Sequence, residues 1–239
     1  MTVTTQTVRE IALENPASIR VFESFGIDYC CGGRKPLAEA CQAKNIPLES
    51  VISALESGPA RGTPATEDWN SKQLTLLTAH IVNAHHAYVR KELPRLAELA
   101  IKVVNRHGDT KAELSQIQGK VTQIGEELIE HLAKEEVVLF PYVAKLERAR
   151  QDKTEIPHGC FGTVANPIAM MTLEHEAAGT LMAEIRELSG NYNLPVGACP
   201  TFHAFYNGLR EFEQDLHQHI HLENNILFPR ALAMEEAGI

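Results

Sequence analysis

From residue 68 onward, apolar residues recur at intervals of three and four, the spacing that places side chains on one face of an α-helix. Val82, Val89, Leu93 and Leu96 form one such stripe. No run of alternating β-branched residues bounded by a tight Asn-Gly or Asp-Gly turn predicts a strand. The pattern therefore predicts an all-α protein whose long helices form an antiparallel four-helix bundle over 69–104, 112–148, 167–189 and 200–235.

A short segment separates this block from a smaller one. Residues 58–67, GPARGTPATE, contain two Gly and two Pro and almost no large apolar side chains, which predicts an exposed linker. We therefore expect one domain over 1–57 and a second over 68–239. The first is a small helical unit with predicted helices over 5–14, 17–25, 37–44 and 48–55. A unit this small has a marginal core, so it is expected to pack against the bundle or a partner.

Composition narrows the class of protein. The 239 residues carry 22 basic and 31 acidic side chains, a formal charge of −9 that argues against nucleic acid or an anionic membrane as partner. No apolar run approaches the roughly 18 residues of a membrane span. The first 16 residues, MTVTTQTVREIALENP, lack the pattern of a secretory signal, so we expect a cytoplasmic protein. Five Cys in such a chain predict thiols, ligands or redox groups rather than a disulfide framework.

The bundle sequence repeats itself. HLAKEEVVLFP at 131–141 aligns without gaps to HIHLENNILFP at 219–229, and in each copy a Glu follows a His by four positions. His131 and Glu135 thus share one helix face, as do His219 and Glu223. A single such pair is more often a surface ion pair than a pair of ligands. Two copies amid apolar residues predict buried carboxylates, which need a compensating charge that a metal ion supplies.

Two further histidines echo this arrangement, with His86 lying 45 residues before His131 and His175 lying 44 residues before His219. The apolar stripe holds His86 on the core face, whereas Glu92, seven positions after His85, predicts that His85 points toward solvent. We expect the remaining histidines to be surface or loop residues: His80, His107, His158, His203, His217 and His221.

Four His and two Glu exceed the four ligands that close a zinc site. The set suits two ions, each bound by two imidazoles and bridged by both carboxylates. Imidazole and carboxylate ligands with open positions favour iron. Manganese or a mixed pair is the alternative.

These motifs resemble two parts of a known family. The two HxxxE…LFP copies with His86 and His175 resemble the hemerythrin-like domain, an up-and-down four-helix bundle with a non-haem di-iron centre. DYCCGG at 28–33 resembles the short helical domain of the iron–sulfur cluster repair di-iron proteins, the RIC family. The resemblance implies two iron ions, with Glu135 and Glu223 bridging, bound by His86, His131, Glu135, His175, His219 and Glu223. It also implies repair of iron–sulfur clusters damaged by nitric oxide or peroxide, through iron donation or through nitric oxide binding and reduction.

Other residues carry weaker indications. Cys30 and Cys31 precede two glycines in an expected flexible, exposed tip, and neighbouring cysteines rarely bond each other. We expect them to bind iron or a cluster transiently, or to link two chains into a homodimer through the N-terminal domain; the alternative is a pair of inert hydrophobic residues. Glu174 is expected either to relay protons and admit ligands or to be an exposed helix residue. Cys41, Cys160 and Cys199 receive no role.

Three functions fit these features. The first is a stress-response di-iron protein that acts on damaged iron–sulfur proteins and has nitric oxide reductase activity at the centre. The second is a non-catalytic carrier or sensor of nitric oxide or oxygen. The third is a metal-stabilised scaffold. The paired thiols favour the first, because a gas carrier does not need them.

Overall fold

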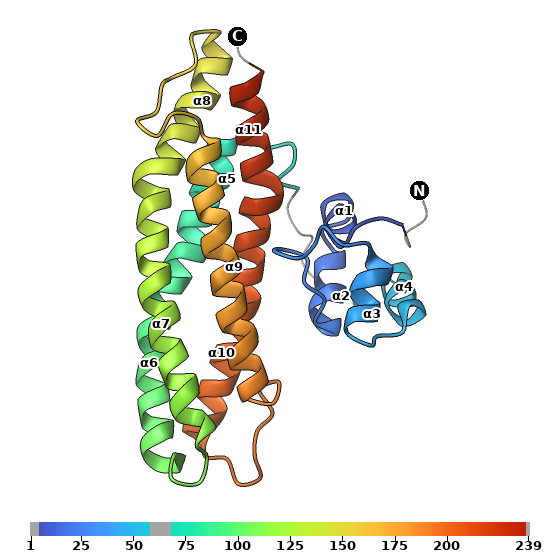
Figure 1. The fold of residues 1–239 in the computed structure, drawn as a ribbon, viewed down its shortest axis with the longest axis vertical. Coiled ribbons are helices and arrows are strands. Elements are labelled where there is room, and N and C mark those ends of the chain that lie inside the picture. Colours follow the sequence, from blue (N-terminus) through green and yellow to red (C-terminus); the bar gives the residue numbers. More distant parts are fainter. Residues whose placement is uncertain (1–4, 58–67, 238–239) are drawn as a thin grey trace.

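The computed structural model describes residues 5–57 and 68–237. Within these ranges the protein is helical and contains no strand, which confirms the predicted all-α class. Four rods form the bundle (Figure 1). Each rod is a continuous run of helical structure, and three of the four contain a π-helical turn (η). In chain order, the four rods comprise α5 (Leu74–Ile81), η1 (Val82–His86) and α6 (Ala87–His107); α7 (Glu113–Lys134), η2 (Glu135–Leu139) and α8 (Phe140–Asp152); α9 (Ala165–Leu188); and α10 (Pro200–His221), η3 (Leu222–Leu227) and α11 (Phe228–Glu236).

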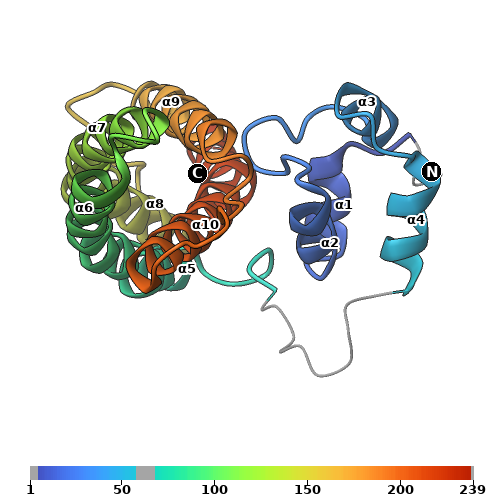
Figure 2. The same cartoon turned by 90° about the horizontal axis from the view of Figure 1, so that it is seen from below.

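Successive rods lie side by side, so that α6, α7, α9 and α10 follow one another around the ring seen in Figure 2. The first rod begins at Leu74, five residues later than predicted. Glu147 explains this start, since its carboxylate accepts hydrogen bonds from the backbone N–H groups of Leu74 (2.6 Å) and Thr75 (3.0 Å). A carboxylate at these unpaired N–H groups stabilises the first turn of a helix.

The core of the bundle consists of two apolar clusters at different heights. The first apolar cluster contains Leu96, Leu128 and Leu216 together with residues of the N-terminal unit. The second apolar cluster lies toward α5, α8 and α11 and contains Leu77 and Leu139. Along each rod, the predicted metal ligands lie where the residues of one cluster give way to those of the other.

The N-terminal unit contains four short helices, which lie beside the bundle (Figures 1 and 2). The first begins with a capping box, in which the Thr7 hydroxyl accepts from the Glu10 N–H and the Glu10 carboxylate accepts from the Thr7 N–H. The predicted linker over 58–67 lies outside the described residues. The four helices are α1 (Val8–Glu14), α2 (Ser18–Phe25), α3 (Leu37–Ala43) and α4 (Leu48–Ser57).

The loop between α2 and α3 connects this unit to the fourth rod. The Asn225 side chain donates to the Tyr29 carbonyl (3.0 Å), and the Tyr29 ring lies edge-on to His221. Arg9 donates to the Asn225 carbonyl (3.3 Å), which has lost its α-helical donor because Pro229 has no N–H. The small unit thus completes its core against the bundle. No helix within the described ranges is long and apolar enough to cross a membrane.

Candidate metal centre

The six side chains predicted as metal ligands meet in one layer of the bundle interior. His86 ends η1, Glu135 begins η2, and Glu223 lies in η3. Each of the six is at most 2% exposed. We call this set the polar layer: His86, His131, Glu135, His175, His219 and Glu223.

The polar layer divides into two groups that share both glutamates. His86 and His219 belong to one group, and His131 and His175 to the other; in each, the candidate ligand atoms lie within 4.8 Å of one another. The Glu135 carboxylate directs one oxygen to each group, with Oε2 at 3.4 Å from His86 Nε2 and Oε1 at 3.4 Å from His131 Nε2. The Glu223 oxygens lie 3.2 Å from His219 Nε2 and 3.1 Å from His175 Nε2. Both carboxylates therefore span the two groups.

The imidazoles face one another with their Nε2 atoms. This distance is 3.2 Å between His86 and His219 and 3.0 Å between His131 and His175. Outer residues contact three of the Nδ1 atoms: Glu136 on His86 (2.7 Å), Glu174 on His131 (2.8 Å) and Asn224 on His175 (2.9 Å).

These outer contacts determine the tautomers. An ionised carboxylate only accepts hydrogen bonds, so Nδ1 of His86 and of His131 carries the proton. Each Nε2 lone pair then points toward the centre. Burial, followed by the neighbouring imidazole, lowers the pKa of both His86 and His131 to about 4. Both rings are therefore neutral at physiological pH and available as ligands.

The carboxylates lack the partners that buried ionised groups require. Among the described residues, neither oxygen of Glu135 or of Glu223 has a hydrogen-bond partner. Burial and the charge of Glu223 raise the pKa of Glu135 well above its usual range. Burial also opposes ionisation of Glu223, but the imidazoles of His219 and His175 outweigh it and hold that pKa well below its usual range. Converging lone pairs and unpaired carboxylate oxygens fit bound cations.

The π-helical turns are the feature that periodicity did not predict. The Phe140 N–H donates to the Glu135 carbonyl and the Phe228 N–H to the Glu223 carbonyl, five residues back in each case. Such turns are frequent at functional sites. For η2 and η3 the duplicated Leu-Phe-Pro was the available signal, because a proline without N–H disturbs the α-helical pairing before it.

One histidine lies elsewhere than predicted. His85 was expected to point toward solvent, but it is 6% exposed, its Nδ1 lies 2.9 Å from Asp215 Oδ1, and its ring stacks on His219. The prediction was wrong because it treated Glu92 as a marker of the solvent face. Glu92 is itself buried and pairs with Arg95 at 2.6 Å.

The expected surface histidines fall into three classes of burial. His158 and His203 are exposed, as predicted, whereas His221 is buried. His217 also contacts the Tyr29 ring, and burial lowers the pKa of both His217 and His221 to about 4. The N-terminal unit covers this face of the fourth rod, which helical periodicity alone does not reveal. The others are half-buried, with His80 stacked on Trp69 and His107 beside Cys199.

The two neighbouring cysteines do not form an exposed tip. Cys30 is buried, and Asp28 Oδ1 accepts from its N–H (2.9 Å) and from the Cys31 N–H (3.0 Å). The Cys31 thiol lies 3.7 Å from the carbonyl oxygen of His175. The hydrogen bond with Cys31 and burial raise the pKa of Cys30 well above its usual range. The expectation of an exposed tip failed because Tyr29 anchors the loop against the fourth rod.

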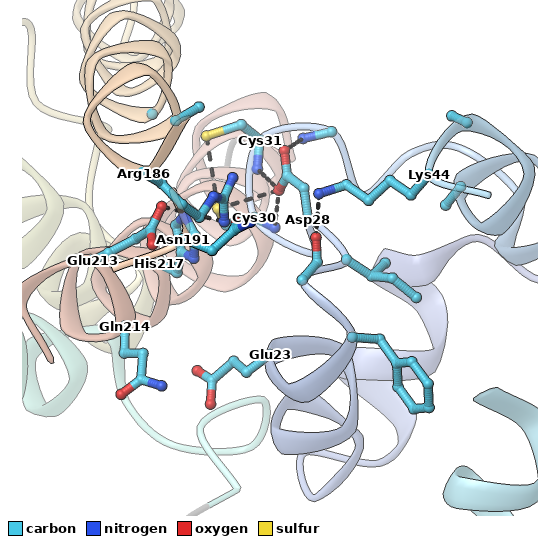
Figure 3. Close-up of a pocket in the computed structure, with 18 of the residues that line it drawn as sticks. Glu23, Asp28, Cys30, Cys31, Lys44, Arg186, Asn191, Glu213, Gln214 and His217 are labelled. Atoms are coloured by element: carbon cyan, nitrogen blue, oxygen red, sulfur yellow. Dashed lines mark hydrogen bonds and ion pairs between the residues drawn. The ribbon is translucent and has the colours of Figure 1, made fainter. Parts of the chain in front are cut away.

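Both thiols line a cavity of about 1210 Å³ between the N-terminal unit and the bundle (Figure 3). Its lining carries both signs of charge, including Asp28, Lys44 and Arg186. Cys31, at the cavity wall, is the more accessible thiol of the pair.

Glu174, for which two roles were expected, is neither free nor fully exposed. Besides contacting His131, its carboxylate binds Lys134. Burial raises its pKa, but the hydrogen bonds from Lys134 and His131 outweigh this and lower the pKa below its usual value. It therefore holds an imidazole at the edge of the polar layer.

Comparison with known proteins agrees with this architecture. Residues 4–58 match the ScdA_N domain of unknown function (DUF542), and residues 77–231 match the hemerythrin HHE cation binding domain. The chain is 36% identical over 233 residues to the iron–sulfur cluster repair protein YtfE of Yersinia pseudotuberculosis serotype O:1b (strain IP 31758), covering 96% of this chain and 98% of that protein. It is 35% identical, with the same coverage, to the protein of the same name from Yersinia pestis (strain Pestoides F). The chain therefore belongs to the RIC family of iron–sulfur cluster repair proteins.

Proposed function

We propose that this protein repairs iron–sulfur clusters damaged by nitrosative or oxidative stress, and that the polar layer holds two iron ions for that purpose. The observation that carries the proposal is the sharing of Glu135 and Glu223 between two histidine pairs. Each pair offers two Nε2 atoms and two carboxylate oxygens, one from each glutamate. In this assignment all six residues are metal ligands and both carboxylates bridge.

The donor set favours iron over zinc or magnesium. Two imidazoles and two carboxylate oxygens for each ion suit iron, and the small number of protein ligands leaves positions open. When bound, a pair of ferrous ions would supply electrons, open positions for nitric oxide or oxygen, and iron for rebuilding a cluster.

The protein's own residues orient and shield these ligands. Phe140 stacks on His86 and Phe228 stacks on His175, with ring centroids 5.7 and 5.8 Å apart. These rings exclude water from two of the four imidazoles. The partly exposed Glu174 side chain holds the Nδ1 proton of His131 near the surface. We assign Glu174 the role of keeping that proton on Nδ1, so that the Nε2 lone pair of His131 stays directed to the centre when the ligand shell changes.

The surroundings of the two N-terminal thiols support a role for them in transfer. Cys31 borders both the cavity and the backbone of His175, whereas Cys30 stays protonated and buried behind it. We assign iron or cluster transfer to Cys31, with Cys30 as its hydrogen-bonding neighbour at an Sγ–Sγ distance of 3.7 Å. A disulfide that links two chains through the N-terminal unit would also use Cys31, since it is the accessible thiol.

The test is repair of a damaged protein. The protein is loaded anaerobically with Fe²⁺ and mixed with a [4Fe–4S] hydratase whose cluster has been destroyed by nitric oxide, and recovery of hydratase activity is measured. We expect recovery with the wild-type protein and none with Glu135→Leu/Glu223→Leu. Recovery equal to that with free Fe²⁺ alone would contradict the proposal.

A second measurement separates repair from a carrier or sensor. Nitric oxide is added to the reduced, loaded protein without oxygen. Repeated formation of nitrous oxide indicates reductase activity, and a stable spectral change without turnover indicates binding alone. An unchanged spectrum indicates a coordinatively closed scaffold and contradicts the proposed open positions.

A further inference from the structure

The two halves of the bundle supply the same ligands but different outer partners. His131 and Glu135 recur 88 positions later as His219 and Glu223, and His86 recurs 89 positions later as His175. The same correspondence relates the outer residues, so each outer contact in one half can be compared with its counterpart in the other half.

One outer contact is present in both halves. Glu136 lies 2.7 Å from Nδ1 of His86. Its counterpart, 88 positions later, is Asn224, which lies 2.9 Å from Nδ1 of His175. The acceptor changes from a carboxylate to an amide oxygen, but the hydrogen bond is retained.

The other outer contact is present in one half only. Glu174 lies 2.8 Å from Nδ1 of His131. The counterpart of Glu174, 89 positions earlier, is His85. His85 stacks flat on His219, with an interplanar angle of 8°, and directs its Nδ1 to Asp215 instead.

His219 consequently lacks the contact that its three equivalents have. Its Nδ1 is buried without a hydrogen-bond partner among the described residues. The second carboxylate oxygen of Asp215, one turn earlier on α10, is likewise buried and unpaired within the part of the chain that the structure describes. No side chain among the described residues bridges His219 Nδ1 and the second Asp215 oxygen, because the ring of His85, which occupies the position between them, lies parallel to His219.

An outer acceptor on Nδ1 fixes the tautomer and orientation of a ligating imidazole and raises the basicity of Nε2, and its loss costs about 10- to 100-fold in metal affinity. We propose that the His86–His219 group holds its cation more weakly than the His131–His175 group and releases it first, and that His85 is the positioning residue behind this difference. This inference rests on the proposed two-metal centre. It identifies the His86–His219 group as the one from which iron is donated.

The bridging carboxylates do not account for the difference in cation affinity between the two groups. Each supplies one oxygen to each group, and the paired distances are nearly equal, at 3.4 and 3.4 Å for Glu135 and 3.2 and 3.1 Å for Glu223. The asymmetry of the histidine contacts therefore lies at position 85.

The experiment measures the release of iron rather than activity. Anaerobic full-length protein loaded with Fe²⁺ is mixed with an excess of a chromogenic ferrous chelator, and absorbance is followed over time. We expect two phases of one equivalent each, with rates at least tenfold apart. In His85→Gln, the amide oxygen can accept from His219 while the amide nitrogen donates to Asp215, so the fast phase should slow about tenfold and the slow phase should not change.

Two further variants assign the phases. Glu174→Ala removes the acceptor from His131 and should accelerate the slow phase alone. His203→Gln alters an exposed histidine on α10, the helix that carries His219, and should change neither phase. If His85→Gln does not fold by circular dichroism, the wild-type and Glu174→Ala traces still carry the test.

The outcomes separate this inference from the function on which it rests. Two bound irons that leave at one rate, or a fast phase that responds to Glu174→Ala and not to a folded His85→Gln, would overturn the inference alone. A folded wild-type protein that binds fewer than two irons would overturn the proposed centre and this inference together.

Discussion

The apolar clusters and the polar layer between them are built by different rules. Leu77 and Leu96 are buried against other apolar side chains, so each removes its surface from water without further help. Glu135 and Glu223 are as deeply buried, yet within the described chain their oxygens have no hydrogen-bond partner. The clusters are complete as protein, whereas the polar layer holds buried carboxylate oxygens whose surroundings fit bound metal. Buried polar atoms without protein partners therefore mark the functional site within a helical core.

The largest expected effect comes from converting the polar layer into apolar core. Glu135→Leu/Glu223→Leu should bind no iron, because both groups lose both carboxylates. Without metal, the variant should be at least as stable as the wild-type protein, since replacing a cluster of buried ionisable groups by well-packed apolar ones is neutral or stabilising by about 1–4 kcal/mol. Thermal unfolding with and without Fe²⁺ and metal analysis measure both effects.

The matched control is Glu126→Leu, which alters an exposed glutamate on α7. It should keep two irons and the metal-dependent rise in Tm. If Glu135→Leu/Glu223→Leu still binds two irons, the polar layer does not differ from the apolar clusters in binding metal, and the prediction is contradicted.

The next effect tests the clusters themselves. Leu96→Ala and Leu77→Ala each remove a fully buried side chain and should lower the free energy of unfolding by about 2–5 kcal/mol. Iron content should not change in either variant, because neither residue belongs to the polar layer. Denaturant unfolding measures the decrease in the free energy of unfolding, which should be the same for the metal-free and the iron-loaded forms. A variant that binds less iron at stoichiometric loading would contradict this prediction.

A smaller effect concerns the part of the first apolar cluster that the N-terminal unit supplies. Asn225→Ala removes one donor to the Tyr29 carbonyl, at a cost of up to about 1.5 kcal/mol. The unit should separate from the bundle more often, and alkylation of Cys30 should accelerate about tenfold. Asn207→Ala, on an exposed site of α10, is the control and should leave the rate unchanged. Equal rates in both variants would show that Asn225 does not hold the unit in place.

The smallest effect distinguishes the two neighbouring thiols. In the wild-type protein, Cys31 should react with iodoacetamide before Cys30, because Cys30 is buried and its pKa is raised by Cys31 and by burial. Mass spectrometry of Cys30→Ser and Cys31→Ser measures each thiol separately. Faster labelling of Cys30 would contradict the arrangement of the cavity wall.

The sequence predicted those features that repeat or recur at a fixed period. Helical spacing identified the rods, and the duplicated HxxxE motif, together with two histidines at matching distances, identified all six residues of the polar layer. Such signals are local, since residues four positions apart share a helix face whatever surrounds them.

Features that depend on packing between distant segments were not predictable in this way. The burial of His221 and Cys30 arises from the contact of the N-terminal loop with the fourth rod, almost 200 positions away in the chain. The position of His85 depends on Asp215 from another rod. The combination of His86 with His219, rather than with a histidine of its own half, likewise depends on the packing of helices that are far apart in the chain.

The most direct test of the polar layer is a diffraction experiment on crystals grown anaerobically with iron, with data collected on both sides of the iron absorption edge. We expect two anomalous peaks in each chain, one between His86 and His219 and one between His131 and His175, with both glutamates in contact with both peaks. A folded protein with one peak, or with peaks away from these side chains, would contradict the account.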